Sequence, residues 1–504
     1  MDKLDQLHVV SDLHLGGIPG HQIFNQGQAL AAVIDHLAGL PLGRQVGLVL
    51  NGDIVDFLAA EDAKHFDPTG APDKLRAIMS DREFSPVFDA LGRFARTDDR
   101  VLVLVLGNHD VELALPQVQD LLLARIVGDD DAARGRIRIA MDGTGYACLV
   151  GGRRVLCIHG NDADPWNIVD HDALRDFIKA QNEGVEPEAP KANAGTRLVV
   201  DVMNEVKKHY PFVDLLKPET VPVPGVLLAL PSHLHAPLLD FAKITLRLAY
   251  DKARTESGFL GGDGPPVAPP PADGYRALDM LTRGNAPRAE GAAKEAAAEA
   301  WLKQAEADFT AGTRPLAALD LDQGGEMLGI GGLIWDRIAG RDPFENLREA
   351  LRKYLVGDRT FQFDTEDGTF TEHDESIGEN VHFIVAGHTH LERRLPRTRG
   401  GGVYFNSGTW IRLIQIREEQ LRTQEAFKPV YEAISRGGLA DLDRMSGLVL
   451  QRRTVVSIWT EDGHVHGELR HALSAEDAAA ATPKPPWKAV LGTRFTSTSI
   501  EKVQ

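Results

Sequence analysis

Five short apolar runs recur along the chain, and a group of polar side chains follows each run directly. The runs are rich in Val, Leu and Ile, a composition typical of strands that are buried on both faces. They cover residues 7–10, 46–50, 101–106, 155–158 and 381–386. Ligands of α/β sheets bind beyond the carboxyl ends of the strands, so we expect the five polar groups to converge on one site.

The polar groups combine carboxylate, imidazole and amide side chains, which bind metal ions and phosphate. Taken singly, each group is ordinary, because Gly and Asp are common turn residues. Their shared position after five strands favours a common site. In chain order the groups are Ser11-Asp12-Leu13-His14, Asn51-Gly52-Asp53-Ile54-Val55-Asp56, Gly107-Asn108-His109-Asp110, His159-Gly160-Asn161-Asp162 and Gly387-His388-Thr389-His390.

The pattern between the runs predicts an α/β layered core. Helix-forming stretches at 28–38 and 86–96 separate the first three runs, and this alternation is typical of helices packed on a sheet. Strand-like runs return only at 381–386, 402–405 and 446–459, so the core is split. The length of 504 residues exceeds the usual limit of one hydrophobic core and predicts a substantial second lobe.

We therefore divide the chain into a core and an insertion. The core comprises residues 1–164 and 381–470, and residues 471–504 form a C-terminal tail. Residues 165–380 form a large, mainly helical insertion or lid, with an extended Pro-rich linker near 264–274.

The helices predicted within the insertion include a short one at 347–355. Another, at 238–250, is strongly amphipathic. It is interpreted either as a lid that packs on the core or as an interfacial helix that makes peripheral membrane contact. The slight basic content of this helix favours the lid.

Charge and hydropathy restrict the partners and the cellular location that we expect for the protein. The formal net charge of -18 disfavours a broadly basic, DNA-coating surface, although a local basic groove stays open. The first residues lack the apolar run of a secretory signal, and no segment has the length of a membrane span, so we expect a cytoplasmic protein. Cys148 and Cys157 flank a predicted hairpin turn at 151–154, which would place them opposite one another, as reduced core thiols.

The ordered set D-x-H, G-D-x-x-D, G-N-H-D, H and G-H-x-H resembles the calcineurin-like metallophosphoesterase family. The match covers residues 7–162 and 381–410 and leaves the insertion unexplained. The resemblance implies a layered metallophosphoesterase β-sandwich flanked by helices. It also implies two metal sites that share Asp53. The first site would be formed by Asp12, His14, Asp53 and His390, and the second by Asp53, Asn108, His159 and His388.

These ligand types suit two divalent transition-metal ions. We expect Mn first, with Fe, Zn or Co as alternatives. Two such ions share a carboxylate and a bridging hydroxide, the expected nucleophile, and stabilise an in-line displacement at phosphorus. By resemblance, His109 protonates the leaving oxygen or binds the phosphate, and Asp56 orients its imidazole. Asp110 supports the loop, and ordinary turn hydrogen bonding is the alternative for Asp56 and Asp110.

Other polar residues are weaker candidates. The spacing of His233 and His235 suits a metal ligand pair, but prolines bracket them and no strand precedes them. Four residues after the fourth run are candidates to face the site, although the acidic ones have the alternative role of capping a helix. These four are Asp162, Asp164, Asn167 and His171.

Departures from subfamily patterns narrow the substrate. Protein Ser/Thr phosphatases of the family carry Arg where this chain has Phe57 and Leu106, so phosphoprotein substrates are disfavoured. The S-D-L-H-L and H-G-N-D segments resemble the UDP-2,3-diacylglucosamine pyrophosphohydrolase branch. That branch has Arg in place of His109 and a much shorter insertion. The similarity supports a nucleotide- or lipid-linked diphosphate.

Three functions follow for testing. The first is hydrolysis of phosphodiesters or phosphomonoesters. The second is a nuclease acting on DNA or RNA, which requires Arg197, Lys207 and Lys208 to line a groove leading to the metals. The third is a catalytically degenerate interaction scaffold, and retention of all seven predicted ligands argues against it.

Overall fold

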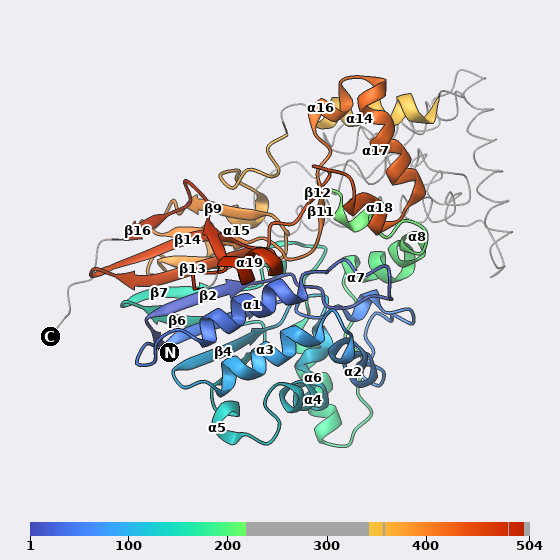
Figure 1. Ribbon diagram of the computed structural model, residues 1–504. Coiled ribbons are helices and arrows are strands. Elements are labelled where there is room, and N and C mark those ends of the chain that lie inside the picture. Colours follow the sequence, from blue (N-terminus) through green and yellow to red (C-terminus); the bar gives the residue numbers. More distant parts are fainter. Residues whose placement is uncertain (218–341, 356–357, 482, 498–504) are drawn as a thin grey trace, which may run out of the picture. The chain divides into compact units, whose positions relative to one another are not determined.

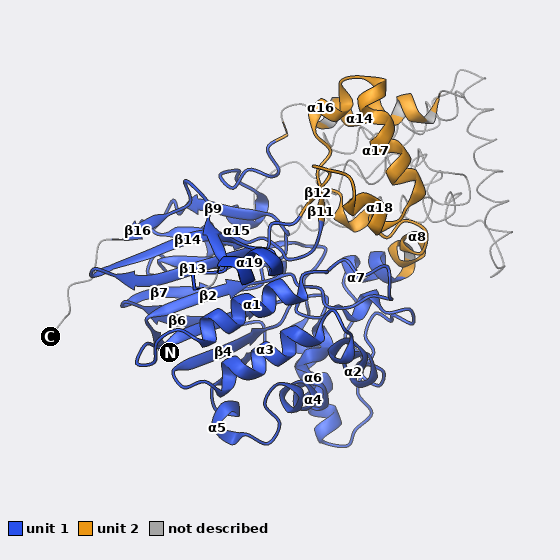
Figure 2. Ribbon diagram, viewed as in Figure 1, with its two compact units in different colours: residues 1–200, 359–412, 451–504 blue, residues 201–358, 413–450 orange. Residues whose placement is uncertain are grey.

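The computed structural model describes residues 1–217, 342–355, 358–481 and 483–497, and this part of the chain is mixed α/β. It divides into two compact units (Figure 2). Unit 1 comprises residues 1–200, 359–412 and 451–504, and unit 2 comprises residues 201–358 and 413–450. The predicted insertion and the predicted core both differ from this division. Residues 165–200 group with unit 1, and residues 413–450 group with unit 2.

The larger sheet of unit 1 joins parallel strands on one side to antiparallel strands on the other. Its order is β15-β14-β13-β2-β3-β4-β5, and β16 also pairs with β14. Strands β2 to β5 are parallel, and β13 joins β2 in antiparallel register. The strands are β2 (Gln6–Val10), β3 (Val46–Asn51), β4 (Arg100–Val105), β5 (Ile137–Ala140), β13 (Thr454–Glu461), β14 (His464–Ala472), β15 (Trp487–Ala489) and β16 (Phe495–Ser497).

The smaller sheet of unit 1 has the order β1-β6-β7-β8-β10-β9. Strands β7, β8 and β10 are parallel, so β7 and β8 end at the same edge of the sheet. The strands are β1 (Asp2–Leu4), β6 (Tyr146–Val150), β7 (Arg153–Cys157), β8 (Phe383–Ala386), β9 (Glu392–Pro396) and β10 (Val403–Ser407). The pairing of β7 with β8 joins segments that lie more than two hundred residues apart in the chain.

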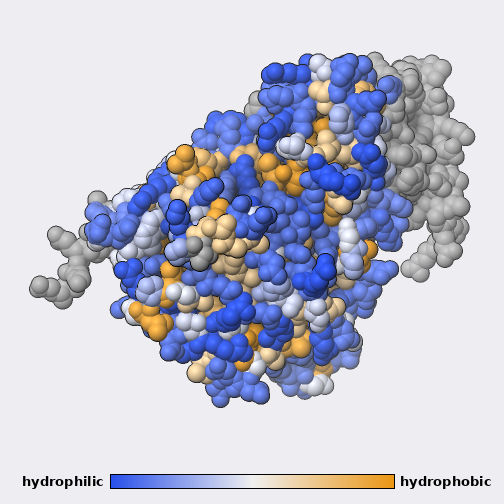
Figure 3. All heavy atoms as spheres, viewed as in Figure 1, coloured by the Kyte–Doolittle hydropathy of each residue, from blue (hydrophilic) through white to orange (hydrophobic). Residues whose placement is uncertain are grey.

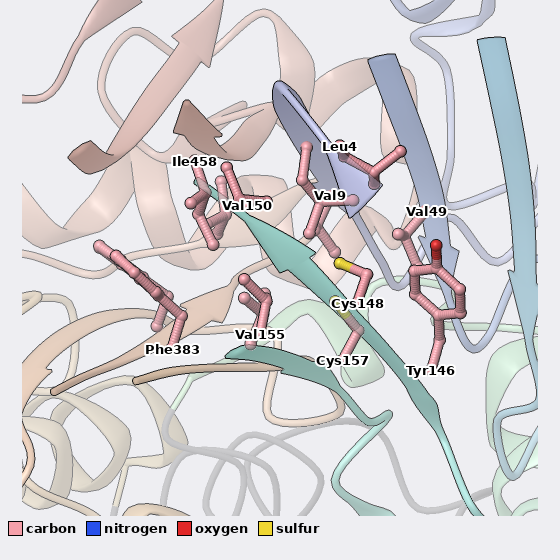
Figure 4. Close-up of a cluster of buried hydrophobic side chains, with 14 of the residues drawn as sticks. Leu4, Val9, Val49, Tyr146, Cys148, Val150, Val155, Cys157, Phe383 and Ile458 are labelled. Carbon is pink, nitrogen blue, oxygen red and sulfur yellow. The ribbon is translucent and has the colours of Figure 1, made fainter. Parts of the chain in front are cut away.

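Side chains from both sheets form one buried hydrophobic cluster, shown in Figure 4. Val9 and Val49 enter it from the larger sheet, and Val155 and Phe383 enter it from the smaller one. Alternate residues of β3, such as Leu48, are equally buried on the opposite face of the sheet. Both faces of the central strands are therefore covered, which explains why these strands read as unbroken apolar runs.

The two cysteines belong to this cluster and are free thiols. Strands β6 and β7 form the predicted hairpin, but Cys148 pairs with Val155 and Cys157 pairs with Tyr146. The expectation that the thiols sit opposite one another was wrong, because the turn lies one residue earlier than the predicted centre and shifts the register by two positions. Figure 4 shows both cysteines among the apolar side chains.

Helices cover the outer faces of the two sheets (Figure 1). On the larger sheet, α1 packs against α3, and α3 contacts β4. On the smaller sheet, Phe370 of α15 packs against Ile384 and Tyr404. The helices of unit 1 are α1 (Gly27–Ala38), α2 (Ala71–Ser80), α3 (Ser85–Arg96), α4 (Pro116–Val127), α5 (Asp131–Arg134), α6 (His171–Asn182), α7 (Ala194–Leu198), α15 (Gly368–Ser376) and α19 (Ala475–Ala481). The layered β-sandwich flanked by helices is thus confirmed.

The described part of unit 2 is mainly helical. Its helices are α8 (Asn204–Lys207), α14 (Pro343–Leu355), α16 (Glu418–Leu421), α17 (Gln424–Arg436) and α18 (Leu439–Asp443), with a small pair of strands, β11 (Leu413–Ile414) and β12 (Val449–Leu450). The buried Arg348 of α14 donates to the carbonyl of Leu421, and Phe344 packs against Phe427. Thr423 caps α17 by accepting from the backbone N–H of Ala426, and Gly437 ends that helix with a φ of 75°.

Three segments differ from expectation in detail. The predicted helix at 347–355 is α14, which begins four residues earlier. The apolar run at 446–459 divides between β12 of unit 2 and β13 of unit 1. The stretch predicted as a tail from residue 471 contains α19, β15 and β16, and both strands pair with β14.

The predicted amphipathic helix at 238–250, the Pro-rich linker at 264–274 and the His233/His235 pair lie outside the described residues. Within the described ranges, no helix combines the length and hydropathy needed to cross a bilayer. The face shown in Figure 3 is mainly hydrophilic, with apolar residues scattered in small groups.

Candidate metal centre

Five strands of unit 1 deliver the predicted ligands to one place. Strands β2, β3 and β4 end next to each other in the larger sheet, and β7 and β8 end next to each other in the smaller one. Each of the predicted ligands lies in the turn that follows one of these strands. In chain order they are Asp12, His14, Asp53, Asn108, His159, His388 and His390.

The backbone of these turns is held in an unusual conformation. Eight non-glycine residues of the described part have positive φ, and five of them are predicted ligands: Asp12, His14, Asp53, His388 and His390. The left-handed region is unfavourable for side chains with a Cβ and persists only where the surrounding structure enforces it. Such outliers gather at functional sites, so the clustering marks this edge of the sandwich independently of the sequence motifs.

Glycines in the same turns let ligand side chains approach the backbone. A Cβ on Gly107 would lie 2.9 Å from Cγ of Asp53, and a Cβ on Gly52 would lie 2.8 Å from Cβ of His159. Gly52 also has a φ of +84°. The glycines of G-D-x-x-D and G-N-H-D are therefore required by close packing against Asp53 and His159.

The first group of donors comprises Asp12, His14, Asp53 and His390, whose ligand atoms all lie within 4.8 Å of one another. Nε2 of His14 lies 3.0 Å from Nε2 of His390, and Nε2 of His390 lies 3.4 Å from Oδ1 of Asp12. Two imidazole nitrogens that face each other need a proton or a cation between them. All four side chains are buried or nearly so.

The second group comprises Asp53, His159 and His388, again within 4.8 Å of one another. Oδ1 of Asn108 joins this group at 3.2 Å from Nε2 of His159. Oδ2 of Asp53 lies 3.2 Å from Nε2 of His159 and 3.6 Å from Nε2 of His14. The same carboxylate oxygen therefore faces both groups, as a bridging ligand must.

In His14, His159 and His388, an outer partner that is not one of the predicted ligands contacts one ring nitrogen. Nδ1 of His14 lies 3.2 Å from Asp56 Oδ2, Nδ1 of His159 lies 2.9 Å from the carbonyl oxygen of Asn51, and Nε2 of His388 lies 3.0 Å from Asp164 Oδ2. Each outer partner is an acceptor and therefore holds the ring proton. The opposite nitrogen is then left with its lone pair, which is the form that binds a metal.

Burial and neighbouring charges shift the pKa values of Asp12, Asp53 and His159 within the two groups. Burial raises the pKa of Asp12. Burial acts in the same direction on Asp53, but the neighbouring His159, His109 and His14 hold its pKa well below the usual range. Burial lowers the pKa of His159, yet the Asp53 carboxylate outweighs this and raises it to about 10. Without a metal, a proton on His159 thus balances the Asp53 carboxylate, and a divalent cation would take over this role and release the proton.

The donor set fits two transition-metal ions. It combines imidazole nitrogens, carboxylate oxygens and one amide oxygen in two groups that share Asp53, and the outer acceptors already select the metal-binding tautomers. Mixed nitrogen and oxygen ligands suit Mn, Fe, Zn or Co better than Ca or Mg.

His109 and Asp56 lie at the edge of the first group. Nδ1 of His109 is 3.3 Å from Oδ1 of Asp56, and the His109 ring is 4.7 Å from the ring of His14. Asp56 also accepts from the backbone N–H groups of Leu58 and Ala59. Burial raises the pKa of Asp56, but His109 and His14 outweigh burial and hold it far below the usual range. Asp56 therefore stays ionised and links a predicted ligand to the predicted acid.

Asn108 and His109 line a pocket of unit 1. Its apolar lining includes Leu58, Phe66 and Leu174, and Lys191 also lines it. Because all lining residues belong to unit 1, the pocket is formed by the core and the segment directly after it.

Among the remaining candidates, Asp110 and Asp164 contact residues of the centre, whereas Asp162 is exposed. Asp110 accepts from the backbone N–H groups of Gly107 and Ile54 and so supports the loop, as predicted. Asp162 is exposed, and Asp170 rather than Asp162 or Asp164 caps α6. Asp164 contacts His388, as predicted for a residue that faces the site.

Of the basic residues proposed for a nucleic-acid groove, Arg197 lies in unit 1, whereas Lys207 and Lys208 lie in unit 2. Lys207 forms an ion pair with Asp214, and Lys208 forms one with Glu205 at 2.7 Å. Their charges are therefore compensated locally.

The supporting roles of Asn51 and Asn406 were not predicted from the sequence. Asn51 provides the carbonyl for His159, and Nδ2 of Asn406 donates to the carbonyl of Gly387 and to Thr389 in the last motif. Asn406 follows the apolar run at 402–405 directly, so the strand-end signal used for the other groups was also present here.

Comparison with known proteins agrees with this geometry. Residues 6–237 match the model of the calcineurin-like phosphoesterase family, whereas neither the curated proteins nor the solved structures gave a match. The matched range contains the predicted ligands from Asp12 to His159, and His388 and His390 join them through the pairing of β7 with β8. The chain therefore carries a calcineurin-like phosphoesterase domain, the domain of a family of metal-dependent phosphoester hydrolases.

Proposed function

We propose that this protein hydrolyses phosphodiesters, including nucleotide- or lipid-linked diphosphates, at a centre of two divalent transition-metal ions. One observation carries the proposal: a single Asp53 oxygen faces both donor groups, and His109 lies beside them. A centre of this kind supplies Lewis-acid activation of the phosphoryl group and of water at neutral pH.

His109 is the proposed general acid. Its Nδ1 is held by Asp56, which fixes the orientation of the ring. In this role, the protonated imidazole of His109 donates a proton to the leaving oxygen. Asp56 in turn contacts His14, so the acid and a metal ligand share one carboxylate.

The pocket beside His109 supports a substrate with a bulky leaving group. Leu58, Phe66 and Leu174 offer apolar contact to that group, and Lys191 at the exposed side would meet a second negative charge, as in a diphosphate. The pocket therefore fits an ester with a bulky leaving group, and Lys191 favours a diphosphate over an ester whose leaving group carries no charge.

A hydrolysis screen tests the proposal. The Mn-loaded protein is assayed on bis(p-nitrophenyl) phosphate, p-nitrophenyl phosphate, UDP-sugar and dinucleoside diphosphates, and single- and double-stranded DNA. We expect turnover of diesters or diphosphates that chelation abolishes. Preference for DNA would indicate the nuclease instead. Absence of turnover by protein that binds two equivalents of Mn²⁺ would indicate the scaffold.

A second experiment tests His109. The His109→Ala variant should lose about 100-fold or more in kcat/KM for a methyl or alkyl leaving group and less than about 10-fold for p-nitrophenolate, which needs little protonation. The matched control is His464→Ala, which removes an exposed histidine of β14. Equal losses for good and poor leaving groups would remove His109 from the acid role.

A further inference from the structure

The loop of residues 159–167 leaves β7 with the predicted ligand His159 and returns to the same centre through Asp164 and Asn167. We infer that Asp164 and Asn167 are positioning residues for the second metal, one acting on His388 and the other on Asn108. The inference rests on the proposed two-metal function and concerns residues that bind no metal themselves.

Asp164 holds His388 through a charge-assisted contact. Its Oδ2 lies 3.0 Å from Nε2 of His388 and accepts from Nδ2 of Asn167 at 2.7 Å. Its Oδ1 accepts from the backbone N–H of Trp166 at 3.0 Å. Both carboxylate oxygens are therefore engaged, and the side chain has one orientation, with Oδ2 directed at the His388 ring.

This contact decides which nitrogen of His388 meets the metal. Nε2 donates its proton to Asp164, so the lone pair at Nδ1 is the one available to the second group. His14 and His159 use the opposite arrangement, with Nδ1 held by an outer acceptor and Nε2 directed inward. Without Asp164, the His388 ring would be free to adopt the other tautomer or to rotate.

Asn167 has the corresponding effect on Asn108. Its Oδ1 lies 3.4 Å from Nδ2 of Asn108, and this acceptor places the amide nitrogen on the outer side. Oδ1 of Asn108 then faces Nε2 of His159 at 3.2 Å, as a metal ligand requires. A flipped amide would direct N–H groups at the cation instead.

The backbone beside the two positioning residues is held by residues that precede and follow it. Nδ2 of Asn161 donates to the carbonyl of Asn167 at 3.0 Å, and the backbone N–H of Gly195 donates to the carbonyl of Trp166 at 2.7 Å. A Cβ on Gly195 would lie 2.9 Å from Cγ of Asn167, so no larger residue fits there. The start of the predicted insertion thus belongs to the support of the metal centre.

The test compares Asp164→Asn with Asp162→Asn. Both substitutions remove one negative charge from the same loop, but Asp162 is exposed. Competition with a chromogenic chelator gives the Kd of each Mn²⁺ equivalent, and the d–d absorption of the Co²⁺-loaded protein reports the ligand geometry. We expect Asp164→Asn to weaken one of the two equivalents about 10- to 100-fold and to change the Co²⁺ spectrum, since outer partners of ligands have effects of this size. Asp162→Asn should match wild type in both readouts.

The melting temperature of the metal-free proteins distinguishes a folding defect from weakened metal binding. This temperature should be the same for Asp164→Asn and wild type. If Asp164→Asn does not fold, Asn167→Ala is compared with wild type in the same way. We expect it to weaken the binding of the same Mn²⁺ equivalent by a smaller factor. Unchanged Kd values and an unchanged Co²⁺ spectrum in the folded variant would overturn the inference while leaving the two-metal function intact. Fewer than two Mn²⁺ equivalents in wild type would refute the function and the inference together.

Discussion

Glu112 provides a quantitative test of how burial acts beside the proposed centre. It lies in a 3₁₀ helix (Val111–Ala114), lines the pocket next to His109 and is 3% exposed. Its Oε1 accepts from the backbone N–H of Asp67 at 2.9 Å. Burial raises the pKa of Glu112 from 4.5 to about 7. The carboxyl group therefore keeps its proton in the folded protein under conditions where the unfolded chain releases it.

The magnitude follows from this difference. The pKa of Glu112 is about 2.5 higher in the folded protein than the ordinary value of 4.5. At about 1.4 kcal/mol for each pKa unit, ionisation of Glu112 lowers the free energy of unfolding by about 3.5 kcal/mol. The folded state binds the proton of Glu112 more tightly than the unfolded chain, and this stabilises the fold at low pH. The stabilisation is fully present below pH 4.5 and is lost as the pH rises to about 7. Part is already lost at pH 5, so about 2.5 kcal/mol remains to be lost between pH 5 and pH 8.

The Glu112→Gln variant keeps the acceptor for Asp67 and cannot ionise. Its melting temperature relative to wild type should therefore rise between pH 5 and pH 8 by roughly 5 °C, at about 2 °C per kcal/mol for a body of this size. Thermal unfolding at fixed scan rate measures this difference. Glu83→Gln is the control, because Glu83 also accepts a backbone N–H, from Gly27 at 3.0 Å, but is only half-buried. A difference for Glu112→Gln that is the same at both pH values would refute the reasoning.

Three further predictions concern the centre and the core. Asp53→Asn should bind fewer than two equivalents of Mn²⁺ and lose at least about 100-fold in turnover, and unchanged metal stoichiometry would contradict the shared carboxylate. Gly107→Ala should likewise lose metal and activity, because its Cβ would overlap Asp53. Gly368→Ala is the control and should lose neither, because a Cβ there meets nothing within 4 Å. Equal effects in the two variants would count against the packing argument. Cys148 and Cys157 should resist Ellman's reagent until the protein unfolds, since burial raises the pKa of Cys148 to about 12; rapid labelling of the folded protein would contradict this.

The sequence predicted the strands of the core well because their signal is local. A strand buried on both faces reads as an unbroken apolar run, so the run at 46–50 and the strand Val46–Asn51 differ by one residue. The helix predicted at 28–38 differs by one residue as well, from Gly27–Ala38. The helix α14 was predicted four residues short, because its first turn begins with Pro343 and has Phe344 as its one large apolar side chain.

The register of the β6–β7 hairpin and the boundaries of the two units could not be predicted from local sequence patterns. The offset of Cys148 from Cys157 depends on the position of one turn, and the division of 446–459 depends on which unit each half packs against. Among the candidate residues, nothing in the sequence distinguished Asp164 from Asp162, which lie in the same loop. Only the folded loop directs Asp164 at His388 and leaves Asp162 exposed.

The sequence by itself determined the side chains that gather at one edge of the sandwich, because ligands that follow parallel strands must meet where those strands end. Only the tertiary structure decided how they are used. It placed Nε2 of His14 against Nε2 of His390 across 376 residues and set one oxygen of Asp53 between the two groups. It also supplied each of three histidines with an outer acceptor. Such contacts depend on distances of a few ångströms between segments remote in the chain, which no local pattern encodes.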